Sequence, residues 1–123
     1  MRILIVDDNS DTAQALARVL GNAGFETVVA FRGADGLKSV QETSFSAALV
    51  DVHLPDLNGL VVSQKIREIG GPQMLMIVMS GDTSMEVINA LPHVGATYFF
   101  AKPLNVSDML RRLKEWTSNR NPA

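Results

Sequence analysis

Five short and almost wholly apolar runs alternate with five longer segments along this chain of 123 residues. The runs lie at 3–6, 27–30, 47–50, 74–79 and 98–101. Continuous apolar runs of this length are typical of parallel strands that helices cover on both faces. Five such units in one chain favour a single α/β domain, a doubly wound parallel sheet with right-handed crossovers. The pattern alone leaves the order of the strands open.

The segments between the runs carry apolar residues at helical spacing, bounded by residues that start and stop helices. Helices are expected from Ser10, over 34–41, after Asn58, over 84–91 and from Asn105. Ile69 is expected to face the core from the third helix, and Pro92 should end or distort the fourth by removing a backbone donor. We expect a domain over 1–118 and a frayed tail over 119–123.

The composition excludes several classes of protein. A net charge of −2 gives no electrostatic footprint for nucleic acid, and the absence of cysteine excludes disulfides and cysteine–zinc sites. The apolar run that follows Met1 is too short for a signal peptide or a membrane span. We therefore expect a cytoplasmic domain that acts without binding nucleic acid or membrane.

Chemically reactive side chains stand where the apolar runs stop. Asp7 and Asp8 follow the first run, Asp51 the third, Ser80 the fourth and Lys102 the fifth. If the runs are parallel strands, these residues share the sheet edge where α/β proteins bind ligands. Carboxylates crowded together need a cation, and Mg²⁺ takes one or two carboxylates together with phosphate oxygens. Taken alone, the acidic pair could merely favour a helix N-terminus.

For two of these residues, Lys102 and Ser80, the sequence also allows an interpretation without a role in phosphoryl binding. Lys102 could pair with Asp51 at rest and with phosphoryl oxygens afterwards, or be an ordinary surface lysine. The Lys102-Pro103 bond is a candidate for the cis form, which would direct the lysine into the pocket. The Ser80 hydroxyl could donate to a phosphoryl oxygen beside the small Gly81, or it could begin a loop or cap the next helix.

Together these motifs resemble the receiver domain of response regulators, the CheY-like family, over essentially the whole chain. The matching features are the acidic pair, the D-x-x-x-P-x-x-x-G loop that starts at Asp51, Ser80 with Gly81, and Lys102-Pro103. Each motif alone is weak, but four in order at matching strand ends are specific. The resemblance implies a flavodoxin-like three-layer fold with five helices and a five-stranded parallel sheet in the order 2-1-3-4-5.

The resemblance also implies a role for each site residue. Asp51 would accept a phosphoryl group from the phosphohistidine of a histidine kinase or a histidine phosphotransfer protein. Asp7, Asp8, Asp51 and the backbone carbonyl of His53 would hold Mg²⁺, for which Mn²⁺ is a substitute. A domain of this kind is a signalling phosphoacceptor, which catalyses only its own phosphorylation and dephosphorylation.

The remaining implied residues concern the switch. Ser80 and Lys102 would bind the phosphoryl oxygens, and the ring of Phe99 would swing inward as Ser80 moves towards them. His53 and Asp82 stand where this family tunes the lifetime of the acyl phosphate. Serine replaces the frequent threonine at 80, and Pro92 interrupts a helix that usually runs further.

Two surfaces are expected to meet partners. A downstream protein or output domain would read the fourth helix, fifth strand and fifth helix. The kinase would contact the first helix and Leu104. The residues named for these surfaces are Met85, Glu86, Val87 or Ile88 and Tyr98 for the readout, and Ala13, Gln14 and Ala17 for the kinase. We expect a monomer at rest and leave phosphorylation-linked dimerisation open.

Three other functions share part of the pattern. A phosphatase with an aspartate nucleophile would use the same chemistry, but the chain lacks the D-x-D-x-T order and a cap for small substrates. A flavin binder would need a glycine- or hydroxyl-rich loop after the first strand, where this chain has two aspartates. A receiver that works by binding alone is the third, and the complete acidic set argues weakly against it.

Overall fold

A computed structural model of the chain describes residues 1–120. Its strands are β1 (Arg2–Val6), β2 (Glu26–Ala30), β3 (Ala47–Asp51), β4 (Leu75–Ser80) and β5 (Tyr98–Ala101). All neighbouring strands pair in parallel, and the sheet has the order β2-β1-β3-β4-β5. The predicted strands and the order implied by the resemblance are therefore confirmed.

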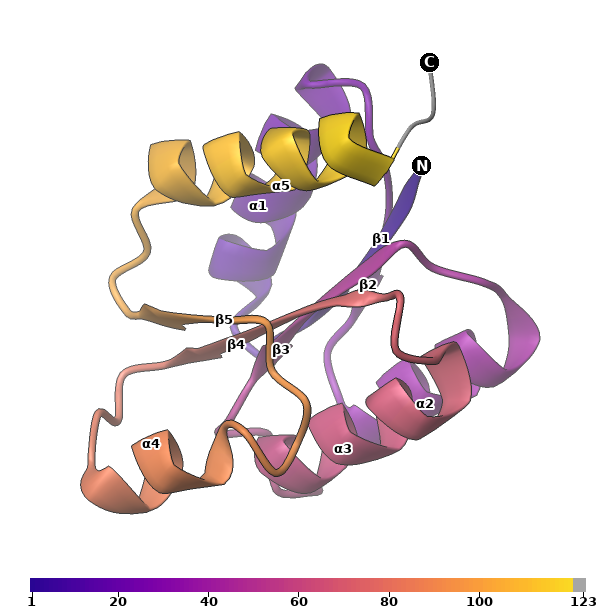
Figure 1. The fold of residues 1–123 in the computed structure, drawn as a ribbon. Coiled ribbons are helices and arrows are strands. Elements are labelled where there is room, and N and C mark those ends of the chain that lie inside the picture. The colour runs from indigo at the N-terminus through magenta and orange to yellow at the C-terminus, as the bar shows by residue number, and fades with distance from the viewer. Residues whose placement is uncertain (121–123) are drawn as a thin grey trace.

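Five helices cover the sheet, as predicted. They are α1 (Ser10–Asn22), α2 (Gly33–Glu42), α3 (Gly59–Gly70), α4 (Met85–Ala90) and α5 (Val106–Arg120). Figure 1 shows α1 and α5 on one side of the sheet and α2, α3 and α4 on the other. Helix α5 continues two residues beyond the expected domain boundary at 118, and the rest of the expected tail, 121–123, lies outside the described residues. Among the described residues, no helix is both long and apolar enough to cross a bilayer.

The alternation of side chains along each strand divides the core into two layers. In β1, Ile3 and Ile5 face α1 and α5, whereas Leu4 and Val6 face the opposite helices. All four are fully buried. Burial on both faces explains why the strands read as continuous apolar runs.

Of the expectations for individual helices, the effect of Pro92 on α4 is confirmed and one placement on α3 is wrong. Helix α4 has only six residues, is capped by the Ser84 hydroxyl and gives way to turns around Pro92. Ile69 was predicted to face the core, and this is wrong, because its side chain is 45% exposed. The Met74 side chain packs against the neighbouring Gly70, and a Cβ atom at residue 70 would meet it at 2.4 Å.

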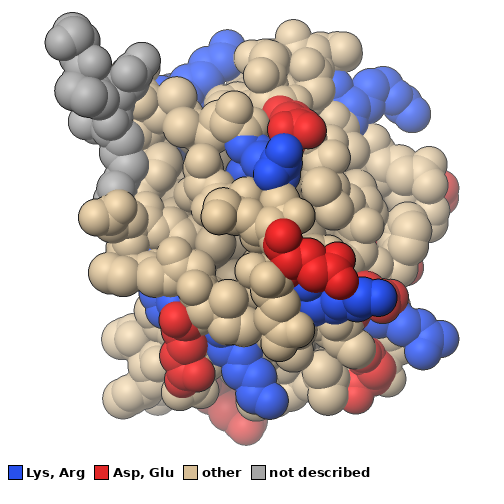
Figure 2. Space-filling model, turned by 90° about the vertical axis from the view of Figure 1, so that its right-hand side faces the viewer, with Lys and Arg blue, Asp and Glu red and all other residues tan. Residues whose placement is uncertain are grey.

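One end of the molecule, where β1 begins and α5 ends, carries a mixed set of charged side chains. Figure 2 shows acidic and basic side chains interspersed on this face, with uncharged residues between them. The N-terminus and the last turn of α5 lie at the opposite end of the sheet from the strand ends that carry the aspartates (Figure 1). The reactive side chains therefore lie at the edge of the sheet away from the start of β1 and the end of α5.

Candidate functional site

Parallel pairing brings the polar strand ends to one edge. Val6 pairs with Val50, so Asp7 and Asp51 directly follow two paired positions. Ser80 is the last residue of β4 and pairs with Ala101, the residue before Lys102. The register thus gathers the predicted residues along three adjacent strand ends and the end of β5.

Three carboxylates form the centre of the site. One oxygen each from Asp7, Asp8 and Asp51 lies within 4.8 Å of the others. Asp7 is 0% and Asp51 5% exposed, whereas Asp8 is open to solvent. Buried carboxylates so close together repel one another, and hard oxygen donors with one open side suit a divalent cation. The donor set therefore fits Mg²⁺, as predicted from the sequence.

Backbone donors orient the two buried acids. The Asn9 amide donates to Asp7 Oδ1 at 3.0 Å, and the His53 amide donates to Asp51 Oδ1 at 2.9 Å. Both bonds come from residues two positions further along, so each strand end folds back on its own carboxylate. These bonds leave the second oxygen of each acid facing the site.

Lys102 bridges the two buried carboxylates through those second oxygens. Its Nζ atom donates to Asp51 Oδ2 at 2.5 Å and to Asp7 Oδ2 at 2.9 Å. The expected resting pair with Asp51 is present, the bond to Asp7 was not foreseen, and the surface-lysine alternative is wrong. The Lys102-Pro103 bond is cis.

The charges at the site are unevenly balanced. Burial raises the pKa of the Asp7 carboxyl, although bonds from Lys102 and Asn9 act in the opposite direction. Burial also opposes the charged form of Lys102, but its bonds to Asp51 and Asp7 outweigh this and raise the pKa of its ammonium group. One ammonium group thus serves two buried carboxylates, and the site retains negative charge for a cation to offset.

Ser80 lies buried beside the carboxylate cluster. Its Oγ atom accepts a hydrogen bond from the Asp82 amide at 2.9 Å, so the hydroxyl does begin a loop, as one alternative held. Helix α4 is capped by Ser84 rather than by Ser80. Because this bond uses a lone pair of the hydroxyl oxygen, the O–H of Ser80 keeps its capacity to donate. A Cβ atom at Gly81 would meet nothing within 4 Å, which agrees with the expected room at this position.

Glycine closes the loop that carries Asp51 for a steric reason. A Cβ atom at Gly59 would stand 1.9 Å from the backbone oxygen of Asp51 and 2.6 Å from Cα of Val52. The Gly59 amide donates to the Val52 carbonyl at 2.8 Å. The last position of the D-x-x-x-P-x-x-x-G motif therefore has to be glycine for the loop to pack against the acid.

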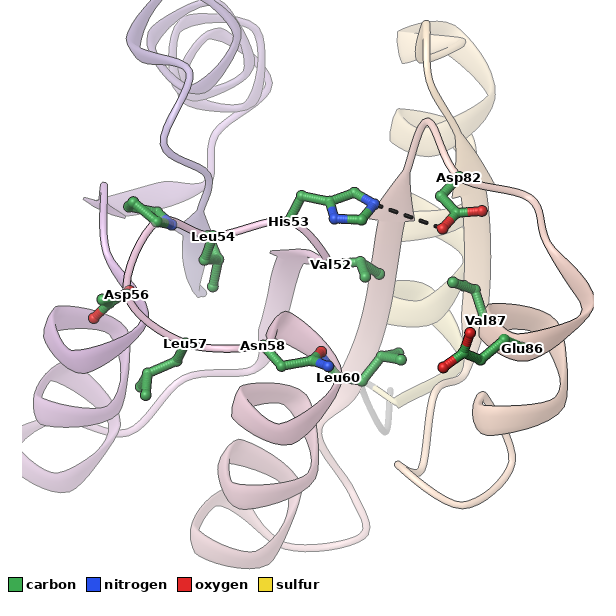
Figure 3. A pocket seen from close by; sticks show the side chains of 11 residues that line it. Val52, His53, Leu54, Asp56, Leu57, Asn58, Leu60, Asp82, Glu86 and Val87 are labelled. Carbon is green, nitrogen blue, oxygen red and sulfur yellow. Dashed lines mark hydrogen bonds and ion pairs between the residues drawn. The ribbon is translucent and has the colours of Figure 1, made fainter.

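The switch and tuning positions occupy the surroundings of the site. Phe99 is half-buried and packs on the core layer beneath α2, α3 and α4. The His53 side chain is 66% exposed, and its Nε2 atom lies 3.8 Å from Asp82 Oδ2 (Figure 3). The His53 carbonyl remains a predicted metal ligand.

Two residues escaped the sequence reasoning. Asp56 accepts bonds from the amides of Gly33 and Ala34 at 2.8 and 3.0 Å, and so caps α2 from another loop. The Ala34 bond, followed by that of Gly33, lowers the pKa of the Asp56 carboxyl. The sequence offered one indirect signal: the residue before α2 is Arg32, which provides no capping side chain, so the cap of α2 has to come from elsewhere.

Arg67 is the second residue that was missed. From α3 it donates to the carbonyl of Gly95 at 2.7 and 3.1 Å and to those of Gly71 and Met74 at 2.9 and 2.5 Å. Burial lowers the pKa of its guanidinium. Arg67 thus ties the loop before β4 to the loop before β5.

The expected partner surfaces need one correction. Ala13 is fully buried and cannot meet a kinase, whereas Thr12, Ala15 and Leu104 line a hollow of about 260 Å³ with Lys102 and Pro103. On α4, Val87 is buried as well. Met85 is 67% and Ile88 36% exposed, so Ile88 is the outward member of the pair left open by the sequence.

Comparison with known proteins agrees with the geometry of the site. The family model of the response regulator receiver domain matches residues 3–114. The transcriptional regulatory protein DltR of Streptococcus agalactiae is 29% identical over 114 residues, which are 93% of this chain and 50% of that protein. The chain spans about half the length, or less, of the curated relatives that it matches.

Solved structures agree in fold and family. A CheY-like response regulator receiver domain protein from Methanospirillum hungatei is 31% identical with a TM-score of 0.90, covering 96% of this chain and 94% of that one. A response regulator from Burkholderia pseudomallei, solved with a phosphorylated aspartic acid, calcium ion and citrate, is 26% identical with a TM-score of 0.83, covering 99% and 75%. The chain therefore belongs to the response regulator receiver domain family of two-component systems.

Proposed function

We propose that Asp51 is the phosphoacceptor of this receiver domain. The observation that carries the proposal is the buried Asp7–Asp51 pair bridged by Lys102 at the end of three parallel strands. The related Burkholderia pseudomallei protein contains a phosphorylated aspartic acid. Membership of the family favours this function over the aspartate phosphatase and the flavin binder.

Asp7, Asp8, Asp51 and the His53 carbonyl would hold Mg²⁺ or its substitute Mn²⁺. The support is the three oxygens within 4.8 Å of one another and the negative charge that a single lysine leaves uncompensated. When bound, the cation supplies charge neutralisation for the carboxylates and for the phosphoryl oxygens.

The chain's own residues account for the rest of the reaction. A carboxylate oxygen of Asp51 attacks the phosphorus of a phosphohistidine. The P–N bond breaks, and its electron pair stays on the imidazole nitrogen, which then takes up a proton from solvent. Lys102 exchanges its bond to Asp51 for one to a phosphoryl oxygen, and the Ser80 hydroxyl donates to another. Positioning and charge provide most of the rate enhancement in such transfers.

The acyl phosphate would then shift a conformational equilibrium. Ser80 moves towards the phosphoryl group and Phe99 fills the space that it leaves, because the half-buried ring packs in the layer next to β4. The added group favours one of two pre-existing states rather than creating a new one. The outward residues of α4, Met85 and Ile88, together with Tyr98, report that state to a downstream protein or output domain.

The phosphoryl donor would dock beside Lys102. The hollow lined by Thr12, Ala15 and Leu104 opens next to this lysine, and so a histidine kinase or a histidine phosphotransfer protein that fills it would approach Asp51. The domain would work in the cytoplasm as a monomer at rest, with phosphorylation-linked dimerisation left open.

Intact-mass analysis tests the assignment of Asp51. The protein is incubated with a small phosphodonor with and without Mg²⁺, together with Asp51→Asn and the exposed control Asp11→Asn. We expect one phosphoryl adduct that requires Mg²⁺, is retained in the control and is absent from Asp51→Asn. An adduct on Asp51→Asn of equal yield would refute the assignment. Absence of any adduct, even with a phosphorylated histidine phosphotransfer protein, would favour a receiver that works by binding alone.

A further inference from the structure

The loop that follows Asp51 is a small closed hairpin. His53 and Asn58 form an isolated antiparallel bridge, and the Gly59 amide donates to the Val52 carbonyl at 2.8 Å. The same backbone orients the acidic side chain, because the His53 amide donates to Asp51 Oδ1 at 2.9 Å. A displacement of this hairpin would therefore move the donor that holds the Asp51 carboxylate.

Asp56 anchors the tip of the hairpin to another element, on the side of the loop away from α4 (Figure 3). Both of its carboxylate oxygens are engaged, Oδ1 with the Gly33 amide at 2.8 Å and Oδ2 with the Ala34 amide at 3.0 Å. Leu57 packs at the same place, since a Cβ atom at Gly33 would meet its side chain at 3.2 Å. The tip is thus attached to the start of α2 by two charge-assisted hydrogen bonds and an apolar contact.

Helix α2 connects this tip to the other half of the carboxylate cluster. The helix packs directly on β1 at Gly36, where a Cβ atom would meet the Val6 side chain at 2.8 Å. Val6 is the last residue of β1 and immediately precedes Asp7. The carboxylates of the cluster come from the ends of β1 and β3. Asp56 therefore joins the loop at one of these strand ends, through α2, to the strand that carries the other.

We propose that Asp56 is a positioning residue of the cation site. By holding the hairpin on α2, it keeps the His53 amide, and with it the Asp51 carboxylate, in place relative to Asp7 and Asp8. The oxygens of Asp56 are themselves occupied by α2, so this residue acts through the backbone of the hairpin and not as a ligand. The inference rests on the proposed function for the identity of the ligand, Mg²⁺, and adds how the site is held in shape.

The start of α2 offers a way to separate this role from simple helix capping. The backbone of Arg32 has the extended geometry of an N-cap residue, with φ −134° and ψ 153°, but its side chain makes no capping bond. A serine at this position can accept from an amide of the first turn and so cap α2 locally. The double variant Asp56→Ala with Arg32→Ser therefore restores the cap without restoring the tether.

Mg²⁺ titrations of the whole isotope-labelled protein, followed by the NMR signals of the Asn9 and His53 amides, measure the affinity. Urea denaturation measures the stability. We expect Asp56→Ala to lower the urea midpoint and to weaken Mg²⁺ binding about fivefold. This is less than the about 10- to 100-fold of a group bonded directly to a metal ligand, because Asp56 acts at a distance through the backbone.

The other variants distinguish position from capping. The double variant should recover the urea midpoint but keep the weakened Mg²⁺ affinity. Asp56→Asn, which retains one acceptor oxygen for the amides of α2, should bind Mg²⁺ with an affinity between those of Asp56→Ala and the wild type. Recovery of both the midpoint and the affinity in the double variant would overturn the proposal, since Asp56 would then serve only as the cap of α2.

Asp35→Ala is the matched control for the lost charge. Asp35 is an exposed acid in the first turn of α2, and within residues 1–120 it forms no ion pair. This variant and Arg32→Ser alone should change the Mg²⁺ affinity by less than about twofold at about 0.1 M salt, where exposed charges are screened. A loss in Asp35→Ala equal to that in Asp56→Ala would overturn the proposal, because charge and not position would then set the affinity.

Two further results are decisive and are distinguishable from each other. If the wild type binds Mg²⁺ and Asp56→Ala binds it equally well, the positioning role is wrong and the cation site stands. If the wild type itself shows no Mg²⁺-dependent shift of the Asn9 and His53 amides, the proposed cation site is wrong, and the role of Asp56 in it falls as well.

Discussion

Replacing Lys102 by methionine should destabilise the domain most when no divalent cation is present. The substitution keeps most of the length of the side chain and removes the ammonium group that bridges Asp7 and Asp51. The lysine side chain is 24% exposed, whereas those of its two partners are 0% and 7% exposed. The variant therefore leaves two nearly buried carboxylates facing each other, with Asp8 close by.

The magnitude follows from the burial. Removing one member of a buried ion pair costs about 3–5 kcal/mol. The solvent-exposed side of the lysine places this site at the lower end, and so we expect a loss of about 3 kcal/mol in EDTA at pH 7.5. Proton uptake limits the loss, because burial already raises the pKa of Asp7. A carboxyl with a raised pKa in the folded state favours folding while it is protonated. The deficit of the variant should therefore shrink as the pH falls from 7 towards 4.

Urea denaturation with and without Mg²⁺ measures both effects. In saturating Mg²⁺ the difference between variant and wild type should fall to about 1 kcal/mol, because the bound cation replaces the lost charge. Lys114→Met on the exposed side of α5 is the matched control and should change the free energy of unfolding by less than about 0.5 kcal/mol. An equal deficit in EDTA and in Mg²⁺ would show that Lys102 does not offset the charge of the acids.

Three further predictions concern residues outside the carboxylate cluster. Arg67→Met should lower the free energy of unfolding by about 2 kcal/mol, because part-buried carbonyls lose their hydrogen-bond donor. The backbone amides of 92–97 should then exchange hydrogen faster. Unchanged protection of these amides would contradict the bridging role of Arg67. Asp56→Asn should make the stability of the domain depend less on pH in the acid range. A carboxyl whose pKa is lowered in the folded state stabilises the fold at pH values above its ordinary pKa of 3.8, and this stabilisation is lost as the pH falls through the folded pKa. A curve that superimposes on that of the wild type would refute this. Gly59→Ala should lower the stability by at least about 2 kcal/mol through displacement of the Asp51 backbone, measured by urea denaturation; a wild-type midpoint would refute the clash.

The strands and the site could be predicted because their signals are local. A strand covered on both faces must be apolar throughout, so 47–50 and 75–79 are recognisable without knowledge of their neighbours. The reactive residues then follow from where each run stops. Parallel strands carry those ends to one edge whichever order they take, which is why Asp7, Asp51 and Lys102 could be grouped before the order was known.

What could not be predicted depends on contacts between elements. The caps of α1 and α3 are the residues immediately before them, whereas the cap of α2 is Asp56, 23 positions beyond Gly33. Ile69 has the helical spacing of a core residue, but its side chain is 45% exposed, and Met74 packs against the neighbouring Gly70 at the end of the helix. Arg67 satisfies carbonyls of two loops that are separate in sequence. Spacing along one helix carries no information on such partners.

The close approach of Gly59 to Asp51 bears on how mutational scans of this domain should be interpreted. Selection for signalling would remove nearly every substitution at 59, and the position would score like the acceptor itself. Yet Gly59 offers no side chain to a reactant, and its intolerance arises from the space that the acceptor's own backbone occupies. A scan that measures abundance alongside signalling would separate the two positions. Substitutions at 59 should lose both, whereas Asp51→Asn should lose signalling alone.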